Sequence, residues 1–329
     1  NFAIGFLNGE TTVMRKMLTK DLTLKVNNLY NLNISNDIPT DDIFHFTALQ
    51  ANAQIAAPTT KNLEYCIYHS SEDAYGSWTD NNAAVTLSAA GDKIYFRVKT
   101  GKSNSVINST FTISDGNVSV GGNVMYLLNH NGTTVTMGNN NCFRSLFASQ
   151  TKLIYAEDLI LPAETLTNYC YGQMFQSCSS LETAPALPAT NLAANCYYSM
   201  FSGCSNLKTA PALPATNLAE SCYYQMFLSC RSLETAPVLN AATLTAQCYF
   251  KMFGNCNKLS SVTMLATDAS AYQCLDSWLQ GASTSGAILT VNNVITTSHT
   301  AWSTISNSKN TPSNWTIKKQ DGTVLRQGN

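Results

Sequence analysis

Cysteine is the residue type whose number and spacing most suggest chemistry in this chain of 329 residues. Nine of the eleven cysteines fall into two series that recur every 26 positions: Cys170, Cys196, Cys222, Cys248 and Cys274, and Cys178, Cys204, Cys230 and Cys256. Such residues could form disulfides, bind a metal or act as nucleophiles. The absence of any CxxC pair speaks against a metal site, and the odd total leaves at least one thiol unpaired within the chain.

Two arrangements of these cysteines are compatible with the spacing. Two cysteines eight residues apart on a helix lie about 12 Å apart, beyond the limit of about 7 Å between the Cα atoms of a disulfide. Cysteines in adjacent repeats would lie close together, but with side chains that point the same way. We therefore expect buried, mostly reduced columns. Some disulfides remain the alternative, which an extracellular location would favour.

No other residues form a recognisable catalytic or metal-binding pattern. The four histidines are scattered, and no HExxH, GxSxG, P-loop or EF-hand motif is present. Asp41 and Asp42 are expected to be solvated linker residues. We expect no enzyme, no catalytic residue, no metal and no cofactor. Glycan hydrolysis would require two carboxylates in a cleft, for which the repeats offer Glu164, Glu182, Glu220, Glu234, Asp268 and Asp276.

The amino-acid composition limits the classes of partner that this chain can bind. Charged residues make up only 12% of the chain, and 19 basic residues nearly balance 20 acidic ones. This balance argues against nucleic acid as a partner, because such binding needs a positive field. No apolar run is long enough for a membrane span, which needs at least about 18 residues. A surface so poor in charge is typical of extracellular binding modules.

The repeat predicts the architecture. Cys170, Met174, Cys178 and Leu181 follow one another at i, i+4, i+8 and i+11, which predicts one face of a short helix or helical turn. Residues 181–187 then predict a short extended segment. Such a unit buries its apolar side only by stacking on its neighbours, so four good copies with irregular ends predict a capped solenoid.

The repeated motif also resembles a known family. The pattern Cys-Tyr-x-x-Met-Phe-x-x-Cys-x-x-Leu, followed by Thr-Ala-Pro-x-Leu-Pro-Ala-Thr, is similar to the BspA-like leucine-rich repeats of Bacteroidota surface proteins over residues 142–290. The tail, with Trp278, Trp302 and Trp315, resembles the terminal cap of that family. Residues 46–130 resemble the β-rich segment that often precedes such repeats. The resemblance implies cell-surface adhesion to host or matrix proteins.

Four regions follow from these patterns, with a mostly β (α+β) fold class. Residues 1–43 predict a β-hairpin plus a linker. The hairpin resembles the closing strands of fimbrillin-like domains, which implies that it is the remnant of an upstream domain of that kind. Residues 44–130 predict a small β-sandwich-like domain, with strands expected at 45–50, 63–69, 83–88, 92–99, 108–114 and 123–128. Residues 131–290 predict the leucine-rich-repeat solenoid, and residues 291–329 its C-terminal cap.

Two columns of residues are candidates for binding. The position two residues after each inward cysteine should face solvent, and it carries Tyr198, Tyr224 and Phe250. Tyrosine is enriched at recognition surfaces, although the rings could instead pack on one another. On the extended part, Glu182, Lys208 and Glu234 form a column of alternating charge, which local stabilisation between strands also explains.

Two functions remain open. The first is a non-enzymatic adhesion module, at the cell surface or secreted, whose repeat face binds a host or matrix protein or a glycan; an upstream lipid anchor would suit it. The alternative is a structural subunit, fimbria-associated or part of a phage fibre, that uses the solenoid as a rigid spacer.

Overall fold

A computed structural model describes residues 39–58, 61–133, 137–282 and 286–329. These residues belong to one compact unit. The hairpin predicted for residues 1–43 and the linker up to residue 38 lie outside the described residues. Among the described residues, no helix is long and apolar enough to cross a membrane.

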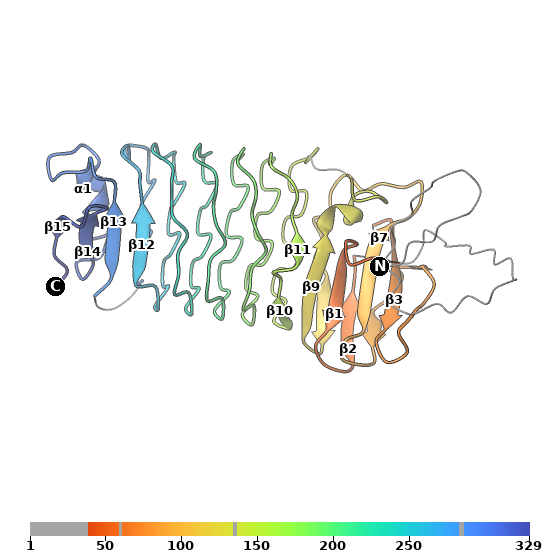
Figure 1. Cartoon of the computed structure of the whole chain (residues 1–329). Helices are drawn as coiled ribbons and strands as arrows, with labels where there is room; N and C mark the ends of the chain where they lie inside the picture. The colour runs from red at the N-terminus through yellow and green to blue at the C-terminus, as the bar shows by residue number, and fades with distance from the viewer. Residues whose placement is uncertain (1–38, 59–60, 134–136, 283–285) are drawn as a thin grey trace, which may run out of the picture. The chain divides into compact units, whose positions relative to one another are not determined.

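The described chain is mostly β-structure, as predicted, with short strands joined by turns (Figure 1). The only helical elements in these ranges are a 3-10 turn, η1 (Val124–Leu127), and one short helix, α1 (Trp302–Ile305). The strands are β1 (His45–Ala48), β2 (Ala53–Ala56), β3 (Leu63–His69), β4 (Ala74–Tyr75), β5 (Thr79–Asp80), β6 (Val85–Leu87), β7 (Lys93–Val98), β8 (Thr112–Asp115), β9 (Val118–Asn123), β10 (Leu153–Tyr155), β11 (Leu159–Ile160), β12 (Ser261–Met264), β13 (Ile288–Val291), β14 (Thr316–Lys319) and β15 (Val324–Arg326).

Two open sheets form the N-terminal part of the described chain. One has eight strands, in the order β10-β9-β1-β7-β3-β4, with β11 also paired to β9 and β5 to β3; the other has the order β6-β2-β8. Side chains alternate along the strands, so that Phe44 and Phe46 are buried in the core beside Phe96, whereas Thr47 and Lys93 lie on the other face.

The predicted strands of this region need two corrections. Four strands, β2, β4, β5 and β9, are not among the predicted ones. The strand expected at 123–128 is the 3-10 turn η1, which follows directly on β9. Asn123 explains the change, since its side chain accepts a hydrogen bond from the Met125 N–H and begins the turn.

The eight-stranded sheet continues into the repeats. β10 and β11 both run parallel to β9, with Leu153 opposite Val118 and Leu159 opposite Gly122. From here the chain runs in successive segments that repeat every 26 positions. These segments, here called coils, lie side by side between β11 and β12 (Figure 1).

Backbone hydrogen bonds join the coils in an alternating pattern. The N–H of Tyr171 donates to the carbonyl of Cys196 in the next coil, at 3.0 Å, and the N–H of Gln173 donates in the same way to Tyr198, at 2.7 Å. The alternate residues donate three positions back within their own coil, as Gly172 does to Tyr169 at 3.0 Å and Met174 to Tyr171 at 3.2 Å. Each coil therefore needs its neighbour to satisfy half of the N–H groups in this segment.

The helical turn predicted at 170–178 is wrong. The segment is a chain of tight turns in which every fourth residue, Tyr169, Gln173 and Ser177, has a positive φ of 58–60°. In an α-helix, a stripe of every fourth residue drifts around the axis by about 40° per step, whereas this four-residue turn keeps the same face inward. Cys170, Met174 and Cys178 are therefore all fully buried. The helical period therefore identifies the buried residues correctly, but the backbone conformation that it predicts is wrong.

Identical side chains stack through the core of the coils. The rings of Phe175, Phe201 and Phe227 lie 5.4 and 5.6 Å apart and nearly parallel. A second ladder of buried tyrosines runs beside them, from Tyr171 to Tyr249. Both ladders reach Trp278, where the repeat ends. Beyond it, the sheet β12-β13-β14-β15 and the buried Trp315 close the core.

Candidate functional site

The predicted aromatic positions form one continuous stack at the edge of the coils. Tyr198 and Tyr224 stack with centroids 5.1 Å apart, and Tyr224 and Phe250 with centroids 4.6 Å apart. We call these three residues the aromatic column. Each ring is partly exposed. Because the backbone bonds hold the coils in register, residues 26 positions apart occupy equivalent places, which is how the sequence alone could find this column.

Two cations flank the aromatic column. Gly172 occupies the equivalent position in the preceding coil, and the ring of Tyr169 approaches Tyr198 there, at 6.4 Å. The Arg144 guanidinium lies 5.1 Å from the Tyr169 ring centre. At the other end, the Lys251 ammonium lies 5.4 Å from the ring centre of Phe250. Within the described ranges, neither cation has a carboxylate partner.

Arg144 is held in place by neutral partners. Its Nε and Nη2 donate to the Gln173 side-chain oxygen at 3.1 and 2.9 Å. The amide of Gln173 in turn donates to the Gln176 side-chain oxygen at 2.9 Å. Since amides do not neutralise the guanidinium, this edge of the coils carries uncompensated positive charge beside the rings.

The charged column is separate from the aromatic one and lies on the extended part of the coils. The Lys208 ammonium lies 3.2 Å from a Glu182 carboxylate oxygen, as the alternating signs predicted. Glu234 joins the column through its backbone, which donates to the Lys208 carbonyl at 2.9 Å. An exposed ion pair of this kind contributes roughly 0–1 kcal/mol. Because these charges partly neutralise one another, the charged column is a weaker candidate for ligand binding than the aromatic column.

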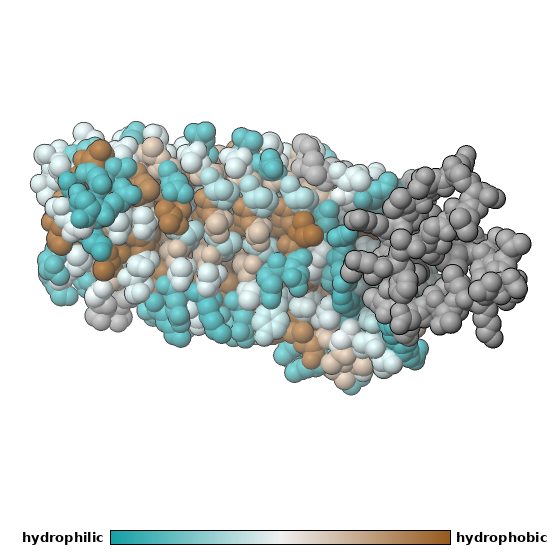
Figure 2. Space-filling model, viewed as in Figure 1, coloured by the Kyte–Doolittle hydropathy of each residue, from teal (hydrophilic) through white to brown (hydrophobic). Residues whose placement is uncertain are grey.

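An apolar row adds to the extended face. Figure 2 shows hydrophobic side chains in a band over the coils between β11 and β12. On the extended segments of the coils, four exposed apolar residues recur at intervals of 26, namely Ile160, Ala186, Ala212 and Val238. The row is short and half of it consists of alanine, so it offers little apolar area to a partner.

The cysteines are not a reactive site. All eleven are unpaired and buried. Burial raises the pKa of Cys178 and Cys196 to about 12, so these thiols stay protonated and unreactive at neutral pH. The Sγ of Cys178 and of Cys204 donate to carbonyls of the preceding coil, Phe147 at 2.9 Å and Phe175 at 3.0 Å. The cysteines thus serve the packing of one coil on the next.

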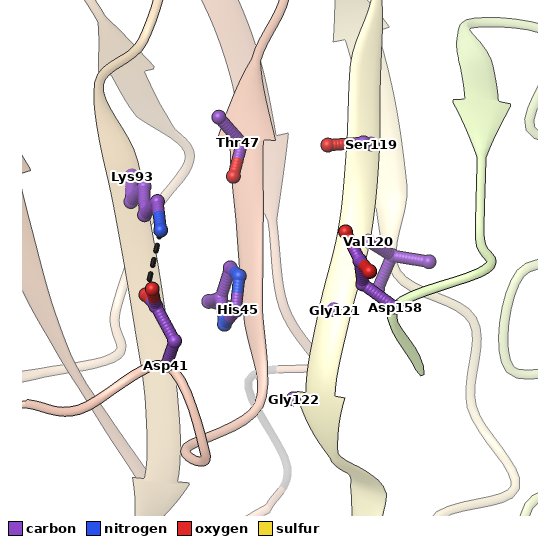
Figure 3. A pocket seen from close by; sticks show the side chains of 9 residues that line it. All are labelled: Asp41, His45, Thr47, Lys93, Ser119, Val120, Gly121, Gly122 and Asp158. Carbon is purple, nitrogen blue, oxygen red and sulfur yellow. Dashed lines mark hydrogen bonds and ion pairs between the residues drawn. The ribbon is translucent and has the colours of Figure 1, made fainter. Parts of the chain in front are cut away.

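A polar pocket that the sequence did not predict lies on the outer face of the eight-stranded sheet (Figure 3). Its volume is about 330 Å³. The lining residues come from the segment before β1, from β1, β7 and β9, and from the link between β10 and β11: Asp41, His45, Thr47, Lys93, Ser119, Val120, Gly121, Gly122 and Asp158.

Asp41 is exposed, as predicted for a linker residue, with 71% of its side-chain surface accessible, but it is also paired. Its carboxylate accepts hydrogen bonds from Lys93 Nζ at 2.6 Å and from the Tyr95 hydroxyl at 3.0 Å. Burial alone would raise the pKa of Asp41, but the hydrogen bond and the charge of Lys93 outweigh it and lower the pKa. Asp41 and Lys93 are therefore a neutralising pair at the rim of the pocket.

His45 is the most buried ionisable side chain of the pocket, with 7% of its surface exposed. Its Nδ1 lies 2.8 Å from the Ile43 carbonyl, and its ring packs on Tyr95 at 5.2 Å. Burial lowers the pKa of His45, so the neutral ring dominates at pH 7. No sequence signal points to this pocket, because its residues come together only through strand pairing.

The described residues contain no group of three or more histidine, cysteine or acidic side chains placed to hold a metal ion. In comparisons with models of protein families, with curated proteins and with solved structures, no match was found.

Proposed function

We propose that this chain is a non-enzymatic binding module, displayed at a cell surface or secreted, whose repeats present one face to a host or matrix protein or a glycan. In this proposal the coils are a BspA-like leucine-rich-repeat solenoid with a period of 26 positions and a C-terminal cap. The sequence motif supports this assignment, and so do the hydrogen bonds between residues 25 or 26 positions apart.

The observation that carries the proposal is the aromatic column with its two flanking cations. Tyr198, Tyr224 and Phe250 stack face to face, so they offer mainly their edges to a ligand. Ring edges carry partial positive charge. Arg144 and Lys251 add full charges that no described carboxylate neutralises. This edge therefore favours a ligand that contributes hydrogen-bond acceptors or negative charge.

Rigidity also favours recognition here. The rings are held by stacking on their neighbours, so binding costs little side-chain entropy compared with a flexible surface. The hydroxyls of Tyr198 and Tyr224 make no hydrogen bond within the described part of the chain and can donate to a partner. Stacking explains why the column is stable, and the unpaired hydroxyls and cations support its use as a binding face.

The experiment is a matrix-protein and glycan array probed with the whole chain, with Tyr198→Ala/Tyr224→Ala, and with a control. Tyr272→Ala is the control, because Tyr272 is 70% exposed but lies outside the aromatic column. We expect the whole chain to bind at least one ligand on the array specifically. The affinity for that ligand should fall at least tenfold in the double variant and stay unchanged in the control. No specific binder, together with assembly into oligomers, would reject adhesion in favour of the structural subunit. Binding retained by the double variant would reject the aromatic column as the site.

A further inference from the structure

The pocket on the outer face of the eight-stranded sheet contains a hydrogen-bond acceptor that has no partner among the described residues. His45 Nδ1 donates its proton to the Ile43 carbonyl at 2.8 Å, so the neutral ring leaves the lone pair of Nε2 free. Nε2 has no hydrogen-bond partner in the described part of the chain. Nε2 is not among the fully buried polar atoms that lack a partner, so it remains accessible from the pocket, where a ligand or water can donate to it.

Gly121 keeps the space in front of this nitrogen open. It lies directly opposite His45 in the pairing of β1 with β9. A Cβ atom at position 121 would lie 2.9 Å from His45 Nε2 and 3.3 Å from the Cβ of Asp158. The bare backbone therefore forms a floor on which the imidazole and the Asp158 side chain border the same space (Figure 3).

Donors and acceptors alternate around this floor. The hydroxyl residues Thr47 and Ser119 lie opposite each other on β1 and β9. Lys93 and Asp41 neutralise each other at 2.6 Å. Asp158, which is exposed and has no ion-pair partner among the described residues, leaves the pocket with a net negative charge. This charge disfavours phosphate and sulfate, and the polar lining disfavours an apolar ligand.

We propose that this pocket binds a neutral sugar ring, the pyranose unit of a glycan, whose hydroxyls donate to Asp158 and to His45 Nε2. A sugar hydroxyl is both donor and acceptor, so one ring can also accept from Ser119, Thr47 and Lys93. The volume of about 330 Å³ accommodates one such ring. The site uses none of the residues of the aromatic column, so either can fail without the other.

The test is ligand-observed NMR and calorimetry on the full chain with a panel of neutral methyl pyranosides. Methylammonium and inorganic phosphate serve as the cationic and anionic probes. We expect saturable binding of at least one pyranoside. Asp158→Asn should weaken it at least tenfold, because the amide replaces one acceptor oxygen with a donor. Gly121→Ala should abolish it, because the new methyl group fills the floor.

Glu157→Gln is the matched control, since it neutralises the adjacent exposed acid that does not line the pocket; it should bind as the wild type does. Thermal melting should show that Asp158→Asn stays folded. The Tyr198→Ala/Tyr224→Ala variant should keep pyranoside binding, which separates this proposal from the adhesion site. The proposal is overturned if no pyranoside saturates, if Asp158→Asn and Gly121→Ala bind normally, or if methylammonium or phosphate binds in place of the sugars.

Discussion

Tyr224 and Phe250, which occupy equivalent positions in successive coils, stack with ring centroids 4.6 Å apart and planes 8° from parallel. Stacked aromatic pairs contribute about 0.5–1.5 kcal/mol beyond the area they bury. We predict a coupling energy in this range for a double-mutant cycle of Tyr224→Ala and Phe250→Ala, measured by urea unfolding. The same cycle on Tyr224 and Tyr272, which do not stack, should give no coupling. Equal coupling in both cycles would contradict a specific contribution from the stack.

The buried tyrosine ladder predicts an unusual result for a conservative change. The hydroxyls of Tyr171, Tyr197 and Tyr223 are buried without a hydrogen-bond partner among the described residues. An unsatisfied buried polar group costs about 1–3 kcal/mol, so Tyr197→Phe should raise the free energy of unfolding by about 1 kcal/mol. Tyr198→Phe, on a partly exposed ring, should leave it nearly unchanged. A clear loss of stability in Tyr197→Phe would show that its hydroxyl has a partner, such as a buried water.

The cysteine columns predict a loss of stability at alkaline pH. Burial raises the pKa of Cys178, Cys196, Cys248 and Cys256 to about 12, whereas a thiol of the unfolded chain titrates near 8.5. Because the folded pKa is the higher one, the stabilisation is complete below pH 8.5 and is lost as the pH rises towards 12. At pH 9.5, ionisation of each such thiol in the unfolded chain should lower the free energy of unfolding by about 1 kcal/mol.

Urea unfolding between pH 7 and 10 measures this effect. Cys178→Ala should reduce the slope of the free energy of unfolding against pH by the contribution of about one proton. The same substitution should lower the free energy of unfolding at pH 7. A thiol count in denaturant without reductant should find all eleven cysteines. A flat pH profile together with only one or two free thiols would contradict the reduced columns.

Two glycines with positive φ should respond differently to alanine. Gly122 has a φ of 75°, and a Cβ atom there would overlap the carbonyl of Ile43, whereas Gly101 has a φ of 72° and open space around it. Gly101→Ala should therefore cost about 1 kcal/mol from backbone strain alone. Gly122→Ala should cost at least about 2 kcal/mol more, because β9 must move away from the segment before β1. Thermal unfolding of the two variants is the measurement, and equal losses would contradict the predicted overlap.

The sequence predicts the buried positions of the repeats more reliably than their backbone. Cys170, Met174 and Cys178 are expected to face inward and do so, but as members of four-residue turns and not of a helix. The doublets Cys-Tyr and Met-Phe, four residues apart, are the signal that distinguishes the two. Two inward and two outward residues in each group of four fit a period of about 4.0 better than a period of about 3.6.

In this protein, the sequence by itself determined which residues stack, because a constant repeat length places identical side chains at equivalent positions, as it does for Tyr198, Tyr224 and Phe250. It could not determine the pocket around His45. Asp41, Lys93, Gly121 and Asp158 are far apart in the chain and carry no shared spacing. Only strand pairing brings them together: β1 pairs with β7 and β9, and β10 and β11, which flank Asp158, pair with β9. The burial of the phenylalanines on the opposite face sets the pairing of β1.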